Sequence, residues 1–452
     1  MSAAGMGASA ARKLADAAVL AAGIAAFWWV LTQYVRLAQL PAWTIDPVDL
    51  MVYRDAGLIV RHAAPFRAPL GPGGLYAWPG PPGLAGLMFT YPPFAAVLFA
   101  PLSHLRLMPL ALDAIRADVL SLCGVSWITL GAVGVPRGIR RLGLTLLCSA
   151  AVFFTEPVQR TIYLGQIDMV LMLLVVWDLC QPARRPWQGA GVGIAAGIKL
   201  VPLLFIPYLL VTRRYRQAAV AAVVFGLTIA VSFVVLPQDA AAYWLHGLFL
   251  QNRAGDVYWN GNQSLLALVS RSAGSQNVQV QWLAMAVMVA LIGLGAAALL
   301  DREGHRMLGL ATCALTGLLV SPISWDHHWV WIVLAVPLLA GYAIRLRGLA
   351  RWSCVALAAF VTAIFWAWPT IYWGEAIRRS DWFLGIIWAA PSSGFWPYRW
   401  HGVHLLAGNA YVLTGLVLLA ILVCVATWLR SPRHTRLKDD SLATPGLPVA
   451  RL

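Results

Sequence analysis

Residues 14–31 read LADAAVLAAGIAAFWWVL, an apolar run that contains a single charge, Asp16. A helix needs about 20 mainly apolar residues to cross a bilayer, so this run predicts a first membrane helix. It is too long for the apolar part of a secretory signal, and no clear small-residue cleavage site follows it. Similar runs recur along the chain, which has 452 residues, is 60% hydrophobic and is 11% charged. Soluble proteins carry about 25% charged residues. We predict an all-α polytopic membrane protein, with one membrane domain over residues 1–430 and a disordered cytoplasmic tail over 431–452.

Positive charge is concentrated in short segments between the apolar runs. The net charge of +15 could suggest a nucleic-acid partner, but this distribution favours a topology signal. Lys and Arg gather in the cytoplasmic loops of membrane proteins, where they also attract anionic lipid headgroups. The basic segments are Arg12-Lys13, Arg137/Arg140/Arg141, Arg184-Arg185, Arg213/Arg214/Arg216, Arg302/Arg306, Arg345/Arg347/Arg351 and the tail from Arg430. We therefore expect membrane lipids as partners and no nucleic acid.

Placing every basic segment on one side gives about twelve membrane helices. The segment 189–211 counts as two of these, because it has basic residues at both ends and is interrupted by Lys199 and Pro202. Proline breaks helical hydrogen bonding, so a short hairpin is favoured over a single span. The long first external loop, 38–109, is expected to carry short interfacial helices. The other helices are expected at 16–37, 112–133, 142–154, 167–179, 218–236, 282–300, 307–320, 329–344, 352–371 and 410–429.

Polar clusters fall on the opposite, extracytoplasmic side in this topology. One contains Asp46, Asp49 and Asp55, and another is Trp325-Asp326-His327-His328. Ionisable groups at a membrane edge are costly to desolvate and persist where they meet a substrate, an ion or one another. Asp46 before Pro47 is typical of a helix start, which places Asp49 in the first turn as a candidate general base.

The two histidines leave three interpretations open. They could bind a phosphate-like anion, bind a metal ion together with Asp326, or form a polar cap between interfacial tryptophans. Neighbouring residues on a helix point about 100° apart, which disfavours a shared metal ion. Lys199 either extends to the membrane interface or contacts a lipid phosphate. The amides of Gln166, Asn262 and Gln263 suit sugar hydroxyls and helix caps equally well.

Six motifs occur in order along the chain, and together they resemble glycosyltransferase family 87 of the GT-C superfamily. The resemblance covers about residues 18–429 and implies a GT-C membrane fold. The motifs are Asp49-Leu50-x-Val52-Tyr53, Tyr91-Pro92-Pro93, Gly165-Gln166-Ile167-Asp168, Gly197-Ile198-Lys199-Leu200-x-Pro202, Gly261-Asn262-Gln263-Ser264 and Ser321-Pro322-Ile323-Ser324-Trp325-Asp326-His327-His328.

The chain resembles the α-1,2-mannosyltransferases of phosphatidylinositol mannoside synthesis in that family. This implies inverting transfer of mannose from polyprenyl-phosphate-mannose to a mannosylated phosphatidylinositol, at the periplasmic face of the plasma membrane. A branching α-1,2-mannosyltransferase of lipomannan and lipoarabinomannan is an alternative with the same motifs. A lipid transporter or flippase is a third, although such a protein should show inverted repeats and charges at mid-membrane.

The resemblance also assigns roles to residues. Asp49 is implied as the base that deprotonates the acceptor hydroxyl, because GT-C enzymes carry this carboxylate in the first long external loop. The departing phosphate needs charge stabilisation rather than protonation. No metal ion or cofactor is expected. The residues expected to bind the donor phosphate or sugar are His327, His328, Lys199, Arg253, Asn262, Gln263 and Gln166, with support from Asp46, Tyr53, Asp55 and Asp326.

Overall fold

The structure is a computed structural model that describes residues 3–38, 47–63, 74–77, 87–181, 185–246, 256–369, 383–389 and 400–431. Most of these residues lie in helices, and one two-stranded antiparallel sheet pairs Trp368 with Leu384. The predicted all-α class is confirmed. Asp46, Arg253 and the predicted tail beyond Ser431 lie outside the described residues, so the interpretations placed on them stay predictions.

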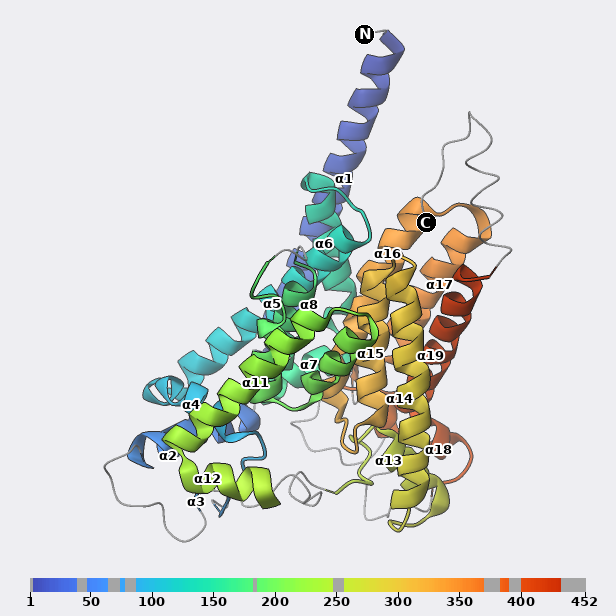
Figure 1. Cartoon of the computed structure of the whole chain (residues 1–452). Coiled ribbons are helices and arrows are strands. Elements are labelled where there is room, and N and C mark those ends of the chain that lie inside the picture. The colour runs from blue at the N-terminus through green and yellow to red at the C-terminus, as the bar shows by residue number, and fades with distance from the viewer. Residues whose placement is uncertain are drawn as a thin grey trace.

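The longer helices form the body of the molecule, and α14, α15, α16 and α19 pack as neighbours within it (Figure 1). Their apolar faces meet in two main cores, one joining helices from α1 to α16 and one centred on Trp329. The helices of ten or more residues are α1 (Ala3–Ala38), α2 (Val48–Ala63), α5 (Leu107–Ala132), α6 (Ile139–Phe153), α8 (Asp168–Leu179), α11 (Tyr215–Val235), α14 (Gln279–Arg302), α15 (Arg306–Val320), α16 (Ala335–Arg345), α17 (Gly348–Ile364) and α19 (Ala410–Leu429).

Shorter elements connect these helices. They are α3 (Gly74–Ala77), α4 (Pro93–Phe99), the 3-10 helix η1 (Pro101–His104), α7 (Glu156–Leu164), α9 (Ala190–Ile198), the 3-10 helix η2 (Val201–Leu204), α10 (Phe205–Val211), α12 (Pro237–Ala241), the π-helix η3 (Ala242–His246), α13 (Leu265–Ala273), the 3-10 helix η6 (Asp326–Leu334), β1 (Trp368–Pro369), β2 (Phe383–Leu384), the 3-10 helix η8 (Ile386–Ala389) and α18 (Val403–Gly408).

Five helical stretches in the described part of the chain are long and apolar enough to cross a membrane. A sixth arises if α7 and α8, which meet at a bend of 115°, are taken as one broken span. These apolar helices mark the chain as a multi-pass membrane protein. The expected number of about twelve membrane helices stays a prediction. The five stretches are Ser9–Arg36, Tyr215–Val235, Gln279–Arg302, Asp326–Arg345 and Ala410–Leu429.

Several elements differ from the predicted helices. The segment 156–166, which lies between the helices expected at 142–154 and 167–179, contains α7. The helix expected at 329–344 begins three residues earlier as η6, where Asp326 Oδ1 accepts the His327 backbone N–H at 2.7 Å and competes with a regular α-helical start. The helix expected at 352–371 ends at Ile364, and Trp368 and Pro369 instead pair in β1.

The segment 189–211 forms the predicted broken hairpin. The helix α9 ends at Ile198, Lys199 is extended, and Pro202 lies in the first turn of the returning η2. The chain on either side of the segment comes together, because Gln217 Nε2 at the start of α11 donates to Gln188 Oε1 at 3.2 Å. Lys199 therefore sits at the turn, away from the basic residues that flank the hairpin.

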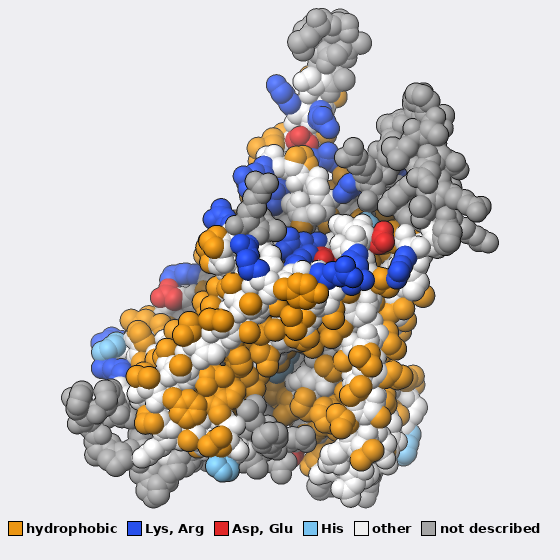
Figure 2. Space-filling view, in the orientation of Figure 1, with side chains coloured by type: hydrophobic (Ala, Val, Ile, Leu, Met, Phe, Trp, Pro, Cys, Tyr) orange, Lys and Arg blue, Asp and Glu red, His pale blue; other side chains and the backbone are white. Residues whose placement is uncertain are grey.

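Basic loops that are distant in sequence gather at one end of the helices. Arg302 donates to the Val211 carbonyl at 3.1 Å, and Arg345 donates to the Val133 carbonyl at 2.7 Å. Figure 2 shows Lys and Arg side chains in a band toward the top of this view, with a broad hydrophobic surface below it. The structure thus brings the basic loops together, as the charge pattern predicts; the side of the membrane that they face stays a prediction.

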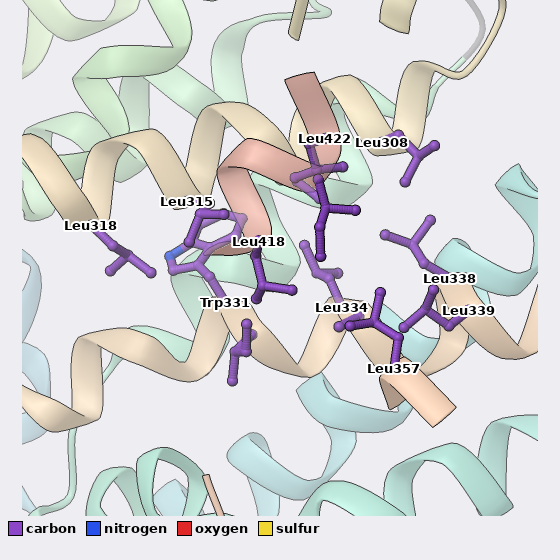
Figure 3. A pocket seen from close by; sticks show the side chains of 14 residues that line it. Leu308, Leu315, Leu318, Trp331, Leu334, Leu338, Leu339, Leu357, Leu418 and Leu422 are labelled. Carbon is purple, nitrogen blue, oxygen red and sulfur yellow. The ribbon is translucent and has the colours of Figure 1, made fainter. Parts of the chain in front are cut away.

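A small apolar cavity of about 100 Å³ lies between α15, η6, α16, α17 and α19 (Figure 3). Side chains such as Leu315, Trp331 and Leu418 line it, and all 14 lining residues are hydrophobic. Sugars and phosphates need hydrogen-bonding partners when they leave water. This cavity is therefore not the candidate site for a polar substrate.

Candidate active site

A second cavity, of about 490 Å³, brings together polar residues from distant parts of the chain. They come from α2, α7, the turn between α7 and α8, the tip of the 189–211 hairpin and the start of η6. Six of the ten expected site residues that the structure describes are among them. The charged and amide residues on its wall are Asp49, Arg160, Gln166, Lys199, Asp326, His327 and His328.

Asp49 lies in the first turn of α2, as expected from the sequence. Its Oδ2 atom accepts a hydrogen bond from Gln166 Nε2 at 2.7 Å. Burial raises the pKa of the Asp49 carboxyl above its ordinary value, although His327, Gln166, Lys199 and Arg160 all act in the opposite direction. A carboxylate with a raised pKa is a better proton acceptor, which suits Asp49 to general-base catalysis.

Gln166 is positioned to orient Asp49. The hydroxyls of Tyr53 and Tyr91 approach its Oε1 atom at 2.5 and 2.9 Å, which turns Nε2 toward the carboxylate. Gly165, just before it, ends α7 with φ 68°, and a Cβ atom there would lie 2.7 Å from Leu50 Cβ. Only glycine allows both this backbone conformation and the close approach of α2. These contacts fix the orientation of the Gln166 amide beside the Asp49 carboxylate.

Two cationic side chains stand on the cavity wall, each held by a carboxylate. Arg160 Nε lies 3.2 Å from Asp326 Oδ2, and Lys199 Nζ lies 2.7 Å from Asp168 Oδ1. Asp326 also accepts from His327 Nδ1 at 3.1 Å. Buried charges need such partners to offset their desolvation. An anion that enters the cavity meets both cations and the imidazoles, which gives charge-assisted hydrogen bonds.

The two histidines lie closer together than the sequence argument assumed. Their rings meet edge to face with centroids 4.6 Å apart, although neighbouring residues of the 3-10 helix η6 point about 120° apart. Ligand atoms of Asp168, His327 and His328 lie within 4.8 Å of one another. The different directions of the two backbone positions therefore do not keep these ligand atoms apart, and the expectation of no metal ion stays a prediction. The Lys199 ammonium nevertheless already neutralises Asp168, and it would repel a divalent ion at this position.

Four described residues of the expected set do not line the cavity: Tyr53, which contacts Gln166, and Asp55, Asn262 and Gln263. Asp55 is on α2 but pairs with Arg54 at 3.4 Å and does not line the cavity. Asn262 is buried, and its amide bonds the carbonyls of Val257 and Pro322 and the Ser324 N–H. Gln263 is also buried, with its Nε2 bonded to the carbonyls of Asn260 and Gly408. These amides hold loops together; the donor-binding role expected of Asn262 and Gln263 and the supporting role expected of Asp55 stay predictions.

Sequence reasoning missed Arg160, Tyr91 and Asp168 as site residues. Tyr91 and Asp168 belong to motifs quoted above, but their contacts with Gln166 and Lys199 become visible only in the three-dimensional structure. Arg160 had one usable signal: it is a lone arginine in a segment expected on the extracytoplasmic side. Its partner Asp326 lies 166 positions later, so no local pattern identifies the pair.

Comparison with known proteins gives consistent matches. The glycosyltransferase family 87 profile matches residues 89–322, slightly more than half of the chain. A Mycobacterium tuberculosis protein named polyprenol-phosphate-mannose-dependent alpha-(1-2)-phosphatidylinositol mannoside mannosyltransferase is 35% identical over 298 residues, 63% of this chain and 68% of that protein. The Mycolicibacterium smegmatis protein of the same name is 33% identical over 342 residues, 71% of this chain and 75% of that protein.

A further M. tuberculosis relative is named for a phosphatidylinositol pentamannoside and is 35% identical over 305 residues, 63% of this chain and 64% of that protein. No solved structure matches the chain. The profile match contains Arg160, Gln166 and Lys199, whereas Asp49 lies before its first residue and His327 lies after its last residue.

Proposed function

Since the chain belongs to glycosyltransferase family 87, we propose that it transfers mannose from polyprenyl-phosphate-mannose to a mannosylated phosphatidylinositol. The transfer inverts the anomeric configuration and forms an α-1,2 linkage. The names of the relatives support this donor and this class of acceptor. One observation carries the mechanism: the Asp49 carboxylate faces the same cavity as Arg160, Lys199 and the two histidines.

The proposed reaction is a direct displacement. Gln166 occupies Asp49 Oδ2, so we assign Oδ1 to the proton of the acceptor 2-hydroxyl. The hydroxyl oxygen attacks the anomeric carbon while its proton moves to Asp49, and the bond from that carbon to the phosphate oxygen breaks. The phosphodiester of the donor carries one negative charge, and the polyprenyl phosphate that leaves carries a second. Arg160, Lys199, His327 and His328 stabilise this added charge.

The same arrangement supports a reaction without metal ion or cofactor. We propose that Lys199 and Arg160, each oriented by its carboxylate partner, lie beside the leaving phosphate and stabilise its second negative charge. A divalent cation would have to compete with two neighbouring cations for its ligands. We therefore propose that activity persists in the presence of a chelator.

The side of the membrane that the site faces follows from the positions of the cavity and of the basic loops at opposite ends of the helices. The cavity residues lie at the hairpin tip and the start of η6, away from the gathered basic loops. The positive-inside rule places those loops in the cytoplasm. We therefore propose a plasma-membrane enzyme whose two ends are cytoplasmic and whose active site faces the periplasm.

An acceptor panel tests this proposal. The purified protein is incubated with polyprenyl-phosphate-mannose, or with a polyprenyl-phosphate carrying another sugar, and with phosphatidylinositol mannosides of increasing length or lipomannan. We expect one hexose to be added to a phosphatidylinositol mannoside from the mannose donor, with or without EDTA, and to be released by an α-1,2-specific mannosidase. Addition of mannose only to lipomannan would show that the enzyme catalyses the branching reaction instead. Transfer only from another donor would contradict the proposal.

A further inference from the structure

Three tryptophans from separate segments form one cluster at the cavity. The ring centroids of Trp259 and Trp325 are 5.7 Å apart, and those of Trp259 and Trp388 are 5.3 Å apart, with both pairs edge to face. The cluster surrounds Gly261, where an added Cβ atom would lie 3.5–3.6 Å from a ring atom of each tryptophan. Trp259 and Trp325 line the cavity, and Trp259 remains 47% exposed.

The rings are held in place from behind. Trp388 donates its indole N–H to the carboxylate of Glu156, which also accepts the Tyr411 hydroxyl. The loop that carries Trp259 is fixed to the loop that carries Trp325 through Asn262, which donates to the Pro322 carbonyl at 3.1 Å and accepts the Ser324 N–H at 2.9 Å. Rigid aromatic side chains lose little entropy on binding, so this surface is preorganised for a ligand.

The surroundings favour a sugar over a lipid chain as the occupant. The exposed indole lines the same cavity as Asp49 and Gln166, and Arg160 lies 5.8 Å from the Trp388 ring centroid. A pyranose ring suits such a place, because it offers an apolar face for the indole and hydroxyls for the polar neighbours. A hydrocarbon chain would leave those polar groups without partners.

The number of sugar rings on each substrate favours the acceptor over the donor as the ligand of the tryptophan cluster. The donor carries a single mannose, which must lie between Asp49 and the cations during transfer. The acceptor carries further mannosyl rings that must leave the reaction centre through the open part of the cavity. A half-exposed aromatic wall there is available to them.

We propose that Trp259, supported by Trp325 and Trp388, is a subsite for a mannosyl ring of the acceptor beyond the ring that is being mannosylated. The inference rests on the proposed function and deepens it by assigning a surface that selects oligomannosyl acceptors. Trp259 is an acceptor-positioning residue and takes no part in proton transfer.

Kinetics of Trp259→Ala test the subsite. We expect the KM for an oligomannosyl acceptor to rise about tenfold, the size of one aromatic contact, with kcat and the KM for the donor unchanged. A monomannosyl acceptor of the same lipid should show no such rise, and Trp259→Phe should keep most of the affinity. Trp28→Ala is the matched control, because Trp28 is 68% exposed on α1, outside the cavity. An unchanged acceptor KM, or a rise in the donor KM instead, overturns the proposal.

A binding measurement separates this proposal from the proposed function. Soluble α-mannotetraose is titrated into the wild-type protein and into Trp259→Ala by calorimetry, without donor. Binding that is lost in the variant supports the subsite even if no donor is used, in which case only the proposed function fails. Transfer activity together with equal binding by both proteins overturns the subsite and leaves the function standing.

Discussion

The two polar ends of the helices use the same kinds of charged residue in different ways. At the basic end, Arg214 pairs with Asp301, and Arg345 bonds the Val133 carbonyl. At the opposite end, Arg160 and Lys199 also have carboxylate partners, but they stand on the wall of a cavity of about 490 Å³. Pairing alone therefore does not separate structural from functional charges. The difference is whether a charged group also faces a space that a substrate can enter.

The largest effect should come from removing the base at the cavity end. Asp49→Asn keeps the size of the side chain but cannot accept a proton, and general-base catalysis contributes about 10²–10⁴-fold. We expect kcat to fall by that amount while donor binding is largely retained. Asp55→Asn is the matched control on the same helix, because Asp55 pairs with Arg54 and does not line the cavity. A normal rate for Asp49→Asn with an inactive Asp55→Asn would place the base elsewhere in the cluster.

The next effect should come from the cations that face the cavity. A charge-assisted hydrogen bond is worth about 1.5–3 kcal/mol, so Arg160→Gln or His327→Ala should weaken use of the donor about tenfold to a hundredfold. His328→Ala should differ from His327→Ala, because only His327 bonds Asp326 through its ring. Initial rates at varied donor concentration measure these losses. If all three variants use the donor normally, the donor phosphate does not bind at this wall of the cavity.

A smaller and more specific effect is expected from Gln166. The base acts when ionised, so activity rises with pH through the pKa of Asp49, which burial has raised. The Gln166 N–H stabilises the carboxylate and opposes that rise. Gln166→Met should therefore move the acidic limb of the kcat profile to higher pH while activity at high pH is kept. Tyr53→Phe should move it less, since Tyr91 still contacts the amide oxygen. A limb that stays in place or moves to lower pH would contradict a positioning role.

The smallest effect on catalysis is expected at the basic end. Asp301 is largely buried, and Arg214→Gln leaves it without its ion-pair partner, which costs up to about 3 kcal/mol in such pairs. The thermal unfolding midpoint in detergent should fall, while KM and kcat at a permissive temperature stay unchanged. A selective loss of donor affinity in Arg214→Gln would show that the two ends do not divide their roles as the structure suggests.

Much of the fold could be predicted because it depends on local composition. The structure has α19 at Ala410–Leu429, the range expected from its apolar run, and the hairpin breaks at Lys199 and Pro202 as expected. The 3-10 start of η6 was not predictable from periodicity, because it depends on a bond between Asp326 and the backbone and on the contact of Asp326 with Arg160.

In the site, too, some features depend on neighbouring residues in the sequence, and others depend on contacts between residues that are distant in the sequence. The position of Asp49 in a first helical turn follows from nearby residues. Three amide residues had equal claims in the sequence, yet Gln166 meets Asp49, whereas Asn262 and Gln263 bond backbone groups of neighbouring loops. Tertiary contacts assign these roles, and a single sequence does not contain them.

The anomeric configuration of the product tests most directly whether the cavity performs a one-step displacement with Asp49 as base. The wild-type protein is incubated with a donor whose mannose is β-linked to the phosphate, and the new linkage is read by nuclear magnetic resonance. An α-1,2 linkage, absent from the Asp49→Asn reaction, is the predicted result. A β-linked product would require two successive displacements through a protein nucleophile, and would contradict the role of Asp49 as the base of a single inversion.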